Sequence, residues 1–384
     1  MTSAVSCLPR TRPLRRWQAS LGTAIAALLS LSLPTAAPAD ENRISGPHAH
    51  ENLAVYLIHG PSASGPVPLT LQEAIAKDAV RVVETGSVNQ LEIENIGTED
   101  VFVQAGDIVK GGKQDRVLTI SMLLTPATGK IGIGAFCVEQ GRWSARGSED
   151  VKRFASADAA LPSREAKLAM LLPAKPAPEP TPIGPTTGAR VAGLYEQRQA
   201  ALPDDTSTRQ RDVWAKVRST QDKLSGSLGA AVAAPQSQSS LQLSLENERL
   251  KKAQQAFVAA LRPVAEKDAD VVGFVVAVNG KLSSADVYPS HGLFRKMWAK
   301  QLNASVTEAI GETASQTAAT PSDRPAAPTL DAVKAFLAGA DKGKASERLI
   351  AGRMKLETRD ADEVLLVQAS RADGSFVHRN YLAK

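Results

Sequence analysis

Cysteine is nearly missing from this chain of 384 residues. Cys7 and Cys137 are its two cysteines, and Cys7 lies in an N-terminal stretch with the features of an export signal. Removal of that stretch leaves Cys137 as the one remaining thiol, which excludes an intramolecular disulfide. The stability of the mature chain must therefore come from buried apolar surface.

The export signal is predicted over residues 1–39. An apolar run covers residues 21–33, small residues at 37–39 form a cleavage motif, and the basic part contains Arg10, Arg12, Arg15 and Arg16. We expect cleavage before Asp40 and export to the periplasm or the medium. Because Arg15 and Arg16 are adjacent, both the general secretory route and the twin-arginine route stay open.

Long apolar runs and a large charge of one sign are also missing. The run at 21–33 is shorter than the roughly 20 residues that a membrane-spanning helix requires, and no later run is longer. The formal net charge of +5 falls to about +1 when the four signal arginines are removed. We therefore expect no membrane anchor and no nucleic-acid partner.

Aromatic residues and familiar catalytic motifs are scarce. Aromatic side chains make up 4% of the chain, which argues against an aromatic-rich carbohydrate-binding sandwich. The common motifs of serine hydrolases, zinc proteases, thiol oxidoreductases and dinucleotide-binding proteins do not occur at useful positions. The sequence does not decide whether the protein is an enzyme, and we expect no cofactor and no metal.

Residues 40–155 are predicted to form a β-rich domain. Thr70 and Glu73 have the spacing of a capping box and predict one short helix. Strands are expected at 53–58, 80–84, 91–95, 101–104, 116–124 and 131–139. Such closely spaced strands predict an antiparallel sheet or sandwich.

The rest of the chain is predicted to be helical and then mixed. Residues 156–245 read as helices and Pro/Ala-rich linkers, and the stretches at 172–188, 230–240 and 313–328 are expected to be extended. Residues 246–384 form an α+β region, and its packing with the β-rich domain as one unit is left open. The fold class is therefore α+β.

Turn and helix signals organise this last region. A helix at 250–261 ends at Pro263, and Asn279-Gly280 predicts a hairpin. A second helix begins after Ser290, a third begins at Thr329, and Asp373-Gly374 marks a hairpin in a C-terminal sheet.

A polar cluster is the strongest candidate site. If strands 116–124 and 131–139 are antiparallel neighbours, polar residues at the start of one meet those at the end of the other. The cluster contains Lys113, Gln114, Asp115, Arg116, Glu139, Arg142 and Trp143. It would bind a small anionic or planar ligand. The alternative is an Arg116–Glu139 or Asp115–Arg142 ion pair that stabilises the sheet edge.

Other candidates are weaker. A phosphate-binding loop would need Gly at Asp107 and Ser or Thr at Gln114, so a hairpin turn at Gly111-Gly112 is favoured. Cys137 is expected to be a buried, unreactive thiol. His48 and His50 lack a third metal ligand at a recognisable spacing.

Two segments, GDIVKGGKQDR at 106–116 and FCVEQGRW at 136–143, resemble the ARG and Rhodanese-Phosphatase-superfamily-associated protein domain family. The resemblance continues through Val213-Trp214 and Asn279-Gly280 to Met297-Trp298, so it covers most of the mature chain. It implies a link to ADP-ribose-like or other phosphorylated metabolites, and it supplies no catalytic residues.

Two functions remain. The first is an exported, non-catalytic binding module for a small anionic or planar ligand or a partner protein. The second is a hydrolase for a phosphorylated or ADP-ribose-like metabolite, with Asp115 or Glu139 as general acid/base and Lys113 or Arg142 holding the anion.

Overall fold

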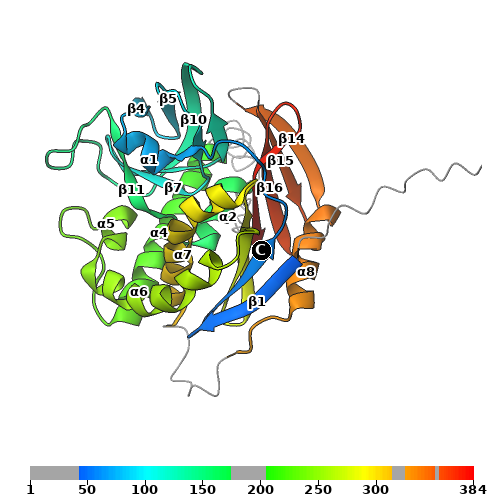
Figure 1. The fold of residues 1–384 in the computed structure, drawn as a ribbon. Coiled ribbons are helices and arrows are strands. Elements are labelled where there is room, and N and C mark those ends of the chain that lie inside the picture. The colour runs from blue at the N-terminus through cyan, green and yellow to red at the C-terminus, as the bar shows by residue number, and fades with distance from the viewer. Residues whose placement is uncertain (1–42, 174–204, 314–324, 351–353) are drawn as a thin grey trace, which may run out of the picture. The chain divides into compact units, whose positions relative to one another are not determined.

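An eight-stranded antiparallel sheet pairs strands from both ends of the described chain (Figure 1). The computed structural model describes residues 43–173, 205–313, 325–350 and 354–384, which belong to one unit, Glu41–Lys384. The strand order is β1 (Arg43–His50), β2 (Leu53–His59), β12 (Val271–Val278), β13 (Lys281–Val287), β17 (Phe376–Ala383), β16 (Val364–Ser370), β15 (Met354–Asp360) and β14 (Lys344–Ile350).

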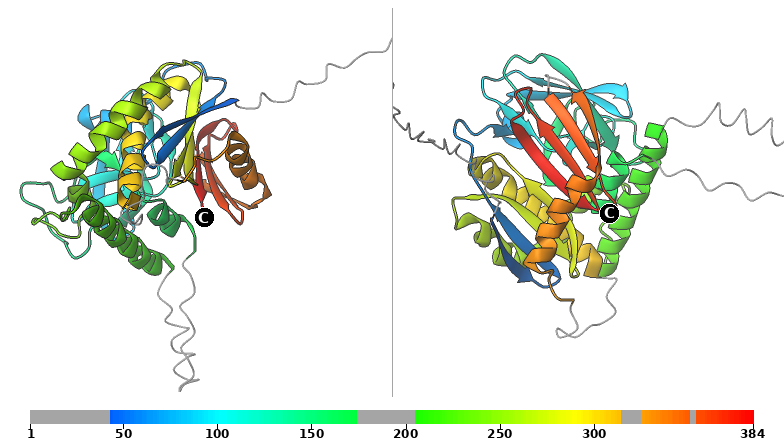
Figure 2. Two further views of the ribbon diagram at one scale, coloured as in Figure 1. Left: turned by 90° about the horizontal axis from the view of Figure 1, so that it is seen from below. Right: turned by 90° about the vertical axis from the view of Figure 1, so that its right-hand side faces the viewer.

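Both faces of this sheet are covered near its β2–β12 pair, which explains why every residue of β2 is buried. Leu53, Val55 and Leu57 belong to the core shared with α7 (His291–Thr313). The alternate residues of β2 face the smaller cluster that contains Val333 of α8 (Leu330–Gly339). The right view of Figure 2 shows α8 lying across the sheet. Two covered faces favour a continuous apolar strand over an alternating one.

A second, six-stranded sheet holds the candidate cluster. Its order is β11 (Phe154–Ala160), β7 (Asp107–Gly111), β8 (Arg116–Leu118), β10 (Lys130–Cys137), β5 (Gln90–Asn95) and β4 (Val80–Ser87). A small third sheet contains β3 (Leu69–Thr70), β6 (Val101–Val103) and β9 (Met122–Leu124), with β3 parallel to β6. The helix α1 (Leu71–Ala76) begins with the predicted Thr70/Glu73 capping box.

Helices pack between and beside the sheets. They are α2 (Arg164–Leu171), α4 (Asp205–Leu228), α5 (Leu241–Leu245) and α6 (Glu248–Leu261), with short 3₁₀ turns at Arg262–Glu266 and Ala340–Lys342. The longest, α4, packs against α7 and α2. Among the described residues, no helix is both long enough and apolar enough to cross a bilayer.

The predicted α+β class is confirmed, together with several local signals. Asn279 and Gly280 have φ of 51° and 72°, as a two-residue hairpin turn requires, and they join β12 to β13. Thr329 caps α8, Ser290 accepts a hydrogen bond from Leu293 at the start of α7, and α6 ends before Pro263. The proposed domain boundaries, including the signal peptide, stay predictions.

The strand prediction was wrong at several places. The expected strand at 116–124 is two strands, β8 and β9, which pair in different sheets. Strands β1, β7, β11 and β14 were not predicted, because their sequences are rich in charge, Ala, Gly or Pro. Of these four, β11 depends on a distant partner, β7, whereas β1, β7 and β14 each pair with a strand next to them in the chain. In the stretch 230–240, which was expected to be extended, residues 235–236 and 238–239 form turns and Ala234 bridges to Ser237. Most of 172–188 and 313–328 lies outside the described residues.

Candidate ligand-binding site

The two predicted stretches meet in space. Strands β8 and β10 pair antiparallel, with Cys137 opposite Arg116. Beyond this pair, the Val138 amide donates to the Asp115 carbonyl at 3.0 Å, and the Asp115 amide donates to Glu139 Oε2 at 3.1 Å. The register of one strand pair therefore brings Asp115 beside Glu139, as the sequence predicted.

The turn between β7 and β8 is a hairpin that needs glycine. Gly111 and Gly112 have φ of 109° and 55°, and a Cβ on Gly112 would lie 2.3 Å from the ring of Phe154. The Gly111 amide donates to Asp115 Oδ1 at 3.1 Å. The glycines thus fix Asp115 against the turn, which agrees with the favoured hairpin interpretation.

Asp115 is completely buried and accepts hydrogen bonds at both carboxylate oxygens. Arg146 donates to Oδ2 at 2.8 Å and to Oδ1 at 3.1 Å, and Ser240 donates to Oδ2 at 2.8 Å. Arg142 lies 3.6 Å away, which confirms one of the two ion pairs considered from the sequence. A bidentate arginine and a hydroxyl leave this carboxylate little freedom to act as an acid or base.

Glu139 is buried in the same network. Arg142 donates to its two oxygens, from Nε at 2.8 Å and from Nη2 at 2.7 Å. Burial alone raises the pKa of Glu139, but hydrogen bonds from Arg142, Ser237 and the Asp115 amide outweigh it and hold the pKa below its usual range. Glu139 is therefore ionised at neutral pH.

Arg116 has a different partner from the one expected. It lies 3.4 Å from Glu84 Oε2 and donates to the Gln114 carbonyl at 2.9 Å, and its side chain is fully buried. Glu84 also accepts from the Lys113 amide at 3.3 Å. The β4 carboxylate, not Glu139, neutralises Arg116.

Two predicted residues remain at the surface of this network. Trp143 is 44% exposed, and the Lys113 ammonium lies 4.9 Å from the centre of its indole. The Arg116 guanidinium lies 5.6 Å from the same ring. Within the described parts of the chain, the Lys113 ammonium has no carboxylate partner. We call Lys113 and Trp143 the rim of the cluster.

Sequence reasoning missed several members of this network, including Ser237, which donates to Glu139, and Glu149, which pairs with Arg146. Glu84 comes from β4, Arg146 from the loop after Trp143, and Ser240 from the start of α5. Arg146 lies within a run of polar residues that directly follows the predicted cluster. Its position in the sequence could therefore have placed it in the site. The contributions of Glu84 and Ser240 come from distant strands and helices and had no local signal.

Comparison with known protein families assigns the chain to one of them. The pattern of the ARG and Rhodanese-Phosphatase-superfamily-associated Protein domain, ARPP-1, matches residues 41–382. The chain belongs to the ARPP-1 family. No curated protein and no solved structure matches it. The two segments that resemble the ARPP-1 family contain the residues of the polar cluster that the sequence predicted, from Lys113 to Trp143.

Cys137 of this ARPP-1 member is buried, as predicted. Burial raises the pKa of its thiol to about 11, although the nearby Arg116 acts in the opposite direction. A thiol with this pKa is protonated at neutral pH, so it is a poor nucleophile.

A separate pocket of about 290 Å³ lies between α2, α4, α7 and the β12–β13 hairpin. Its polar wall includes Glu308, which accepts from the Ser283 hydroxyl at 3.0 Å and the Arg164 amide at 3.3 Å. Burial raises the pKa of Glu308, although Lys167, Ser283 and Arg164 partly oppose it. Glu312, one helical turn further, also lines the pocket and pairs with Lys223 at 2.6 Å. No sequence pattern had indicated this pocket.

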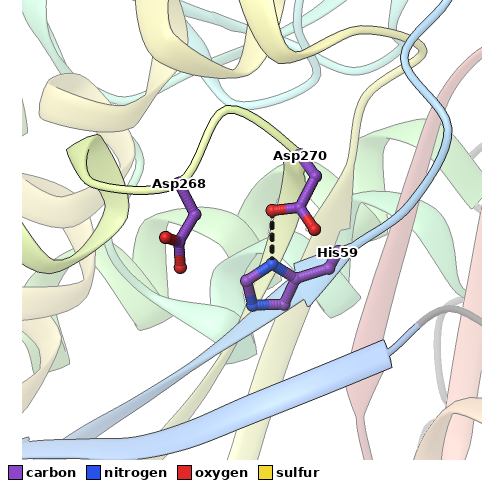
Figure 3. A group of neighbouring side chains, drawn as sticks. All are labelled: His59, Asp268 and Asp270. Atoms are coloured by element: carbon purple, nitrogen blue, oxygen red, sulfur yellow. Dashed lines mark hydrogen bonds and ion pairs between the residues drawn. The ribbon is translucent and has the colours of Figure 1, made fainter.

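The histidines occupy different environments. His291 lies in the first turn of α7 and His378 lies on β17, as predicted. His50 packs edge-on against Phe257. His59 is 2% exposed at the end of β2, beside Asp268 and Asp270 (Figure 3). These three side chains form the group of possible metal ligands found among the described residues.

Proposed function

We propose that this protein is an exported, non-catalytic binding module that holds a small planar anion at the rim formed by Lys113 and Trp143. The observation that carries the proposal is an exposed indole beside an ammonium group without a carboxylate partner. An indole face provides stacking area for a planar ligand, and the ammonium provides the charge for an anion.

The underlying network supports binding without chemistry. Arg146 holds both oxygens of Asp115, and Arg142 donates to Glu139, whose pKa is lowered. The carboxylates of Glu84, Asp115, Glu139 and Glu149 are paired with Arg116, Arg142 and Arg146, and none of these pairs includes Lys113. The network then acts as a rigid support for the rim.

Thermal-shift titration of the mature chain with ADP-ribose, AMP and ribose 5-phosphate tests this proposal. We expect stabilisation by the planar nucleotides at millimolar concentrations, lost in Trp143→Ala and Lys113→Ala and retained in Lys281→Ala. Lys281 is the matched control because it lines the Glu308 pocket. Loss of the response in Lys281→Ala alone, or no response at all, would contradict binding at the rim.

Export is part of the same proposal. It is supported by the basic, apolar and small-residue segments of residues 1–39. N-terminal sequencing of protein recovered outside the cytoplasm should begin at Asp40. Recovery of the full-length chain in the cytoplasm alone would contradict export.

A hydrolase is the second candidate function, and the Glu308 pocket is the observation that favours it. Glu308 and Glu312 are four residues apart on α7, so both carboxyl groups lie on one helix face. A carboxyl with a raised pKa beside an ion-paired carboxylate is the arrangement that separates a general acid from a general base. Hydrolysis of a glycosidic bond would transfer the Glu308 proton to the leaving group, while Glu312 takes a proton from the attacking water.

Hydrolysis of aryl glycosides and ADP-ribosyl conjugates, followed against pH, tests this second function. Glu308→Gln should abolish turnover, whereas Trp143→Ala should leave it unchanged. Turnover that survives Glu308→Gln would exclude the pocket as the catalytic site. This result is independent of ligand binding at the rim.

A further inference from the structure

A second group of polar side chains lies where β2 ends and β12 begins. It contains His59, Asp268 and Asp270. His59 ends β2, and the two aspartates lie in the turn before β12. One ligand atom from each of the three residues lies within 4.8 Å of the others. Figure 3 shows the imidazole beneath the two carboxylates, which come from the same turn. The sheet therefore brings a buried nitrogen base to two exposed acids that are distant in sequence.

The Nδ1 atom of His59 has two close contacts that it cannot satisfy at the same time. His59 Nδ1 lies 2.8 Å from Arg43 Nη2, which can only donate, and 2.8 Å from Asp270 Oδ1, an acceptor when ionised. A single nitrogen cannot accept from Arg43 and donate to Asp270 at once. In either tautomer, one of these short contacts places like groups against each other.

The other ring nitrogen fits one tautomer well. His59 Nε2 lies 2.7 Å from the Ser45 hydroxyl, which can accept the Nε2 proton. Nδ1 then presents a lone pair toward Asp270, and the Arg43 guanidinium contacts both of these groups. Asp268 adds a third possible ligand atom within 4.8 Å of the others. Metal-binding histidines commonly have their second nitrogen held by a hydrogen bond in this way.

We propose that His59, Asp268 and Asp270 bind a divalent first-row transition metal ion in exchange for Arg43. One imidazole nitrogen and two carboxylate oxygens form a donor set that suits Zn²⁺ or Mn²⁺. A metal ion removes the conflict, because Nδ1 and both carboxylates can then donate to the same cation. Arg43 is 60% exposed, so its side chain is able to leave.

The contacts among Ser45, His59 and Asp270 also resemble a nucleophile, base and acid relay. The burial of the residues argues against that interpretation. In such relays the orienting carboxylate is buried, whereas Asp270 is 51% exposed and His59 is 2% exposed. The guanidinium at Nδ1 would in addition oppose the proton that the relay needs there.

Competition with a chromophoric chelator for Zn²⁺ tests the proposal on the mature chain, and Co²⁺ absorbance reports the coordination. We expect one ion per chain. Asp268→Asn and Asp270→Asn should each weaken binding by more than about tenfold. Arg43→Ala should tighten it, because the competing cation is removed. The exposed Asp331→Asn in α8 is the matched control and should leave affinity unchanged.

Three results would overturn the proposal. The first is no binding of Zn²⁺, Co²⁺ or Mn²⁺ beyond that of the Asp268→Asn/Asp270→Asn double variant. The second is binding that survives the double variant and disappears in His48→Ala/His50→Ala, which places the metal elsewhere. The third is an affinity unchanged in Arg43→Ala, which removes the exchange. The aspartate variants decide the matter because His59→Ala creates a cavity at a buried position.

Discussion

Asp115 and Glu139 are buried in the ion-pair network, whereas Glu308 is half-buried in the wall of the pocket. The two environments shift the pKa of a glutamate in opposite directions. Arginine side chains donate directly to Asp115 and Glu139, whereas Glu308 receives a serine hydroxyl and a backbone amide. The pKa of Glu139 is consequently lowered and that of Glu308 is raised. Burial alone does not set the charge of a carboxyl group; a direct guanidinium partner does.

The largest expected effect comes from removing the centre of the network. Asp115→Ala leaves the buried Arg142 and Arg146 without one of their acceptors. Breaking a buried ion pair by deleting one partner costs about 3–5 kcal/mol, so we expect this loss in the free energy of unfolding by urea denaturation. Asp331→Ala, an exposed position, should change it by less than about 0.5 kcal/mol. Equal effects of the two substitutions would show that the network does not stabilise the fold.

Replacing each glutamate by glutamine compares the stabilising effect of the two carboxyl groups directly. Glu139→Gln should cost about 1.5–3 kcal/mol at neutral pH, because it weakens hydrogen bonds between charged groups. Glu308→Gln should cost less than about 1 kcal/mol, because the donors to Glu308 are a hydroxyl and a backbone amide, which can also donate to the amide oxygen of Gln. Similar losses at the two positions would contradict the difference in protonation.

The pH dependence gives the sign of each contribution. The pKa of Glu139 is lowered, so its stabilisation is present above the unfolded-state pKa and is lost as pH falls through the folded-state pKa. The pKa of Glu308 is raised, so its contribution to stability decreases as pH rises through the folded-state pKa. Urea denaturation of each Gln variant and the native chain between about pH 2 and pH 8 measures both slopes, because the lowered pKa of Glu139 places its titration on the acid side of an ordinary glutamate.

Cys137 extends the comparison to a buried thiol without an ionic partner. With its thiol pKa raised to about 11, we expect little reaction with Ellman's reagent in the native protein and one equivalent after denaturation. Rapid reaction of the native thiol near neutral pH would show that the strand pair β8–β10 opens or that the thiol is accessible.

The smallest effect on stability is expected at the rim. Trp143→Ala removes cation–π contacts with Lys113 and Arg116, which are worth about 0.5–1 kcal/mol at exposed sites. Its midpoint of urea denaturation should therefore stay close to that of the native chain, in contrast to Asp115→Ala. A loss as large as that of Asp115→Ala would make Trp143 part of the structural network instead of the rim.

Local signals predicted much of the fold correctly. The Thr70/Glu73 capping box, the Asn279-Gly280 turn and the Thr329 cap depend on neighbouring residues, and all three occur in the structure. Strand β11 was missed because its one partner in the sheet, β7, is more than forty residues away in the sequence, and β7 was missed although it also pairs with the adjacent β8. Their polar and alanine-rich sequences gain strand structure from that pairing.

The candidate site was predictable to a similar degree. Antiparallel pairing of β8 and β10 was readable from the sequence, so the meeting of Asp115 and Glu139 was expected. The partner of Arg116 was not, because Glu84 comes from a strand that is not adjacent to β8 in the sheet. The Glu308 pocket requires four separate elements and has no pattern in any one of them.

The sequence by itself determined the α+β class, the ARPP-1 family and the local turns and caps, because these depend on residues close together in the chain. Tertiary structure decided which buried acids are paired with arginine, where the pocket lies, and how His59 meets Asp268 and Asp270. The physical reason is that pKa, burial and metal-ligand geometry depend on distances of a few ångströms between side chains, which only the folded chain sets.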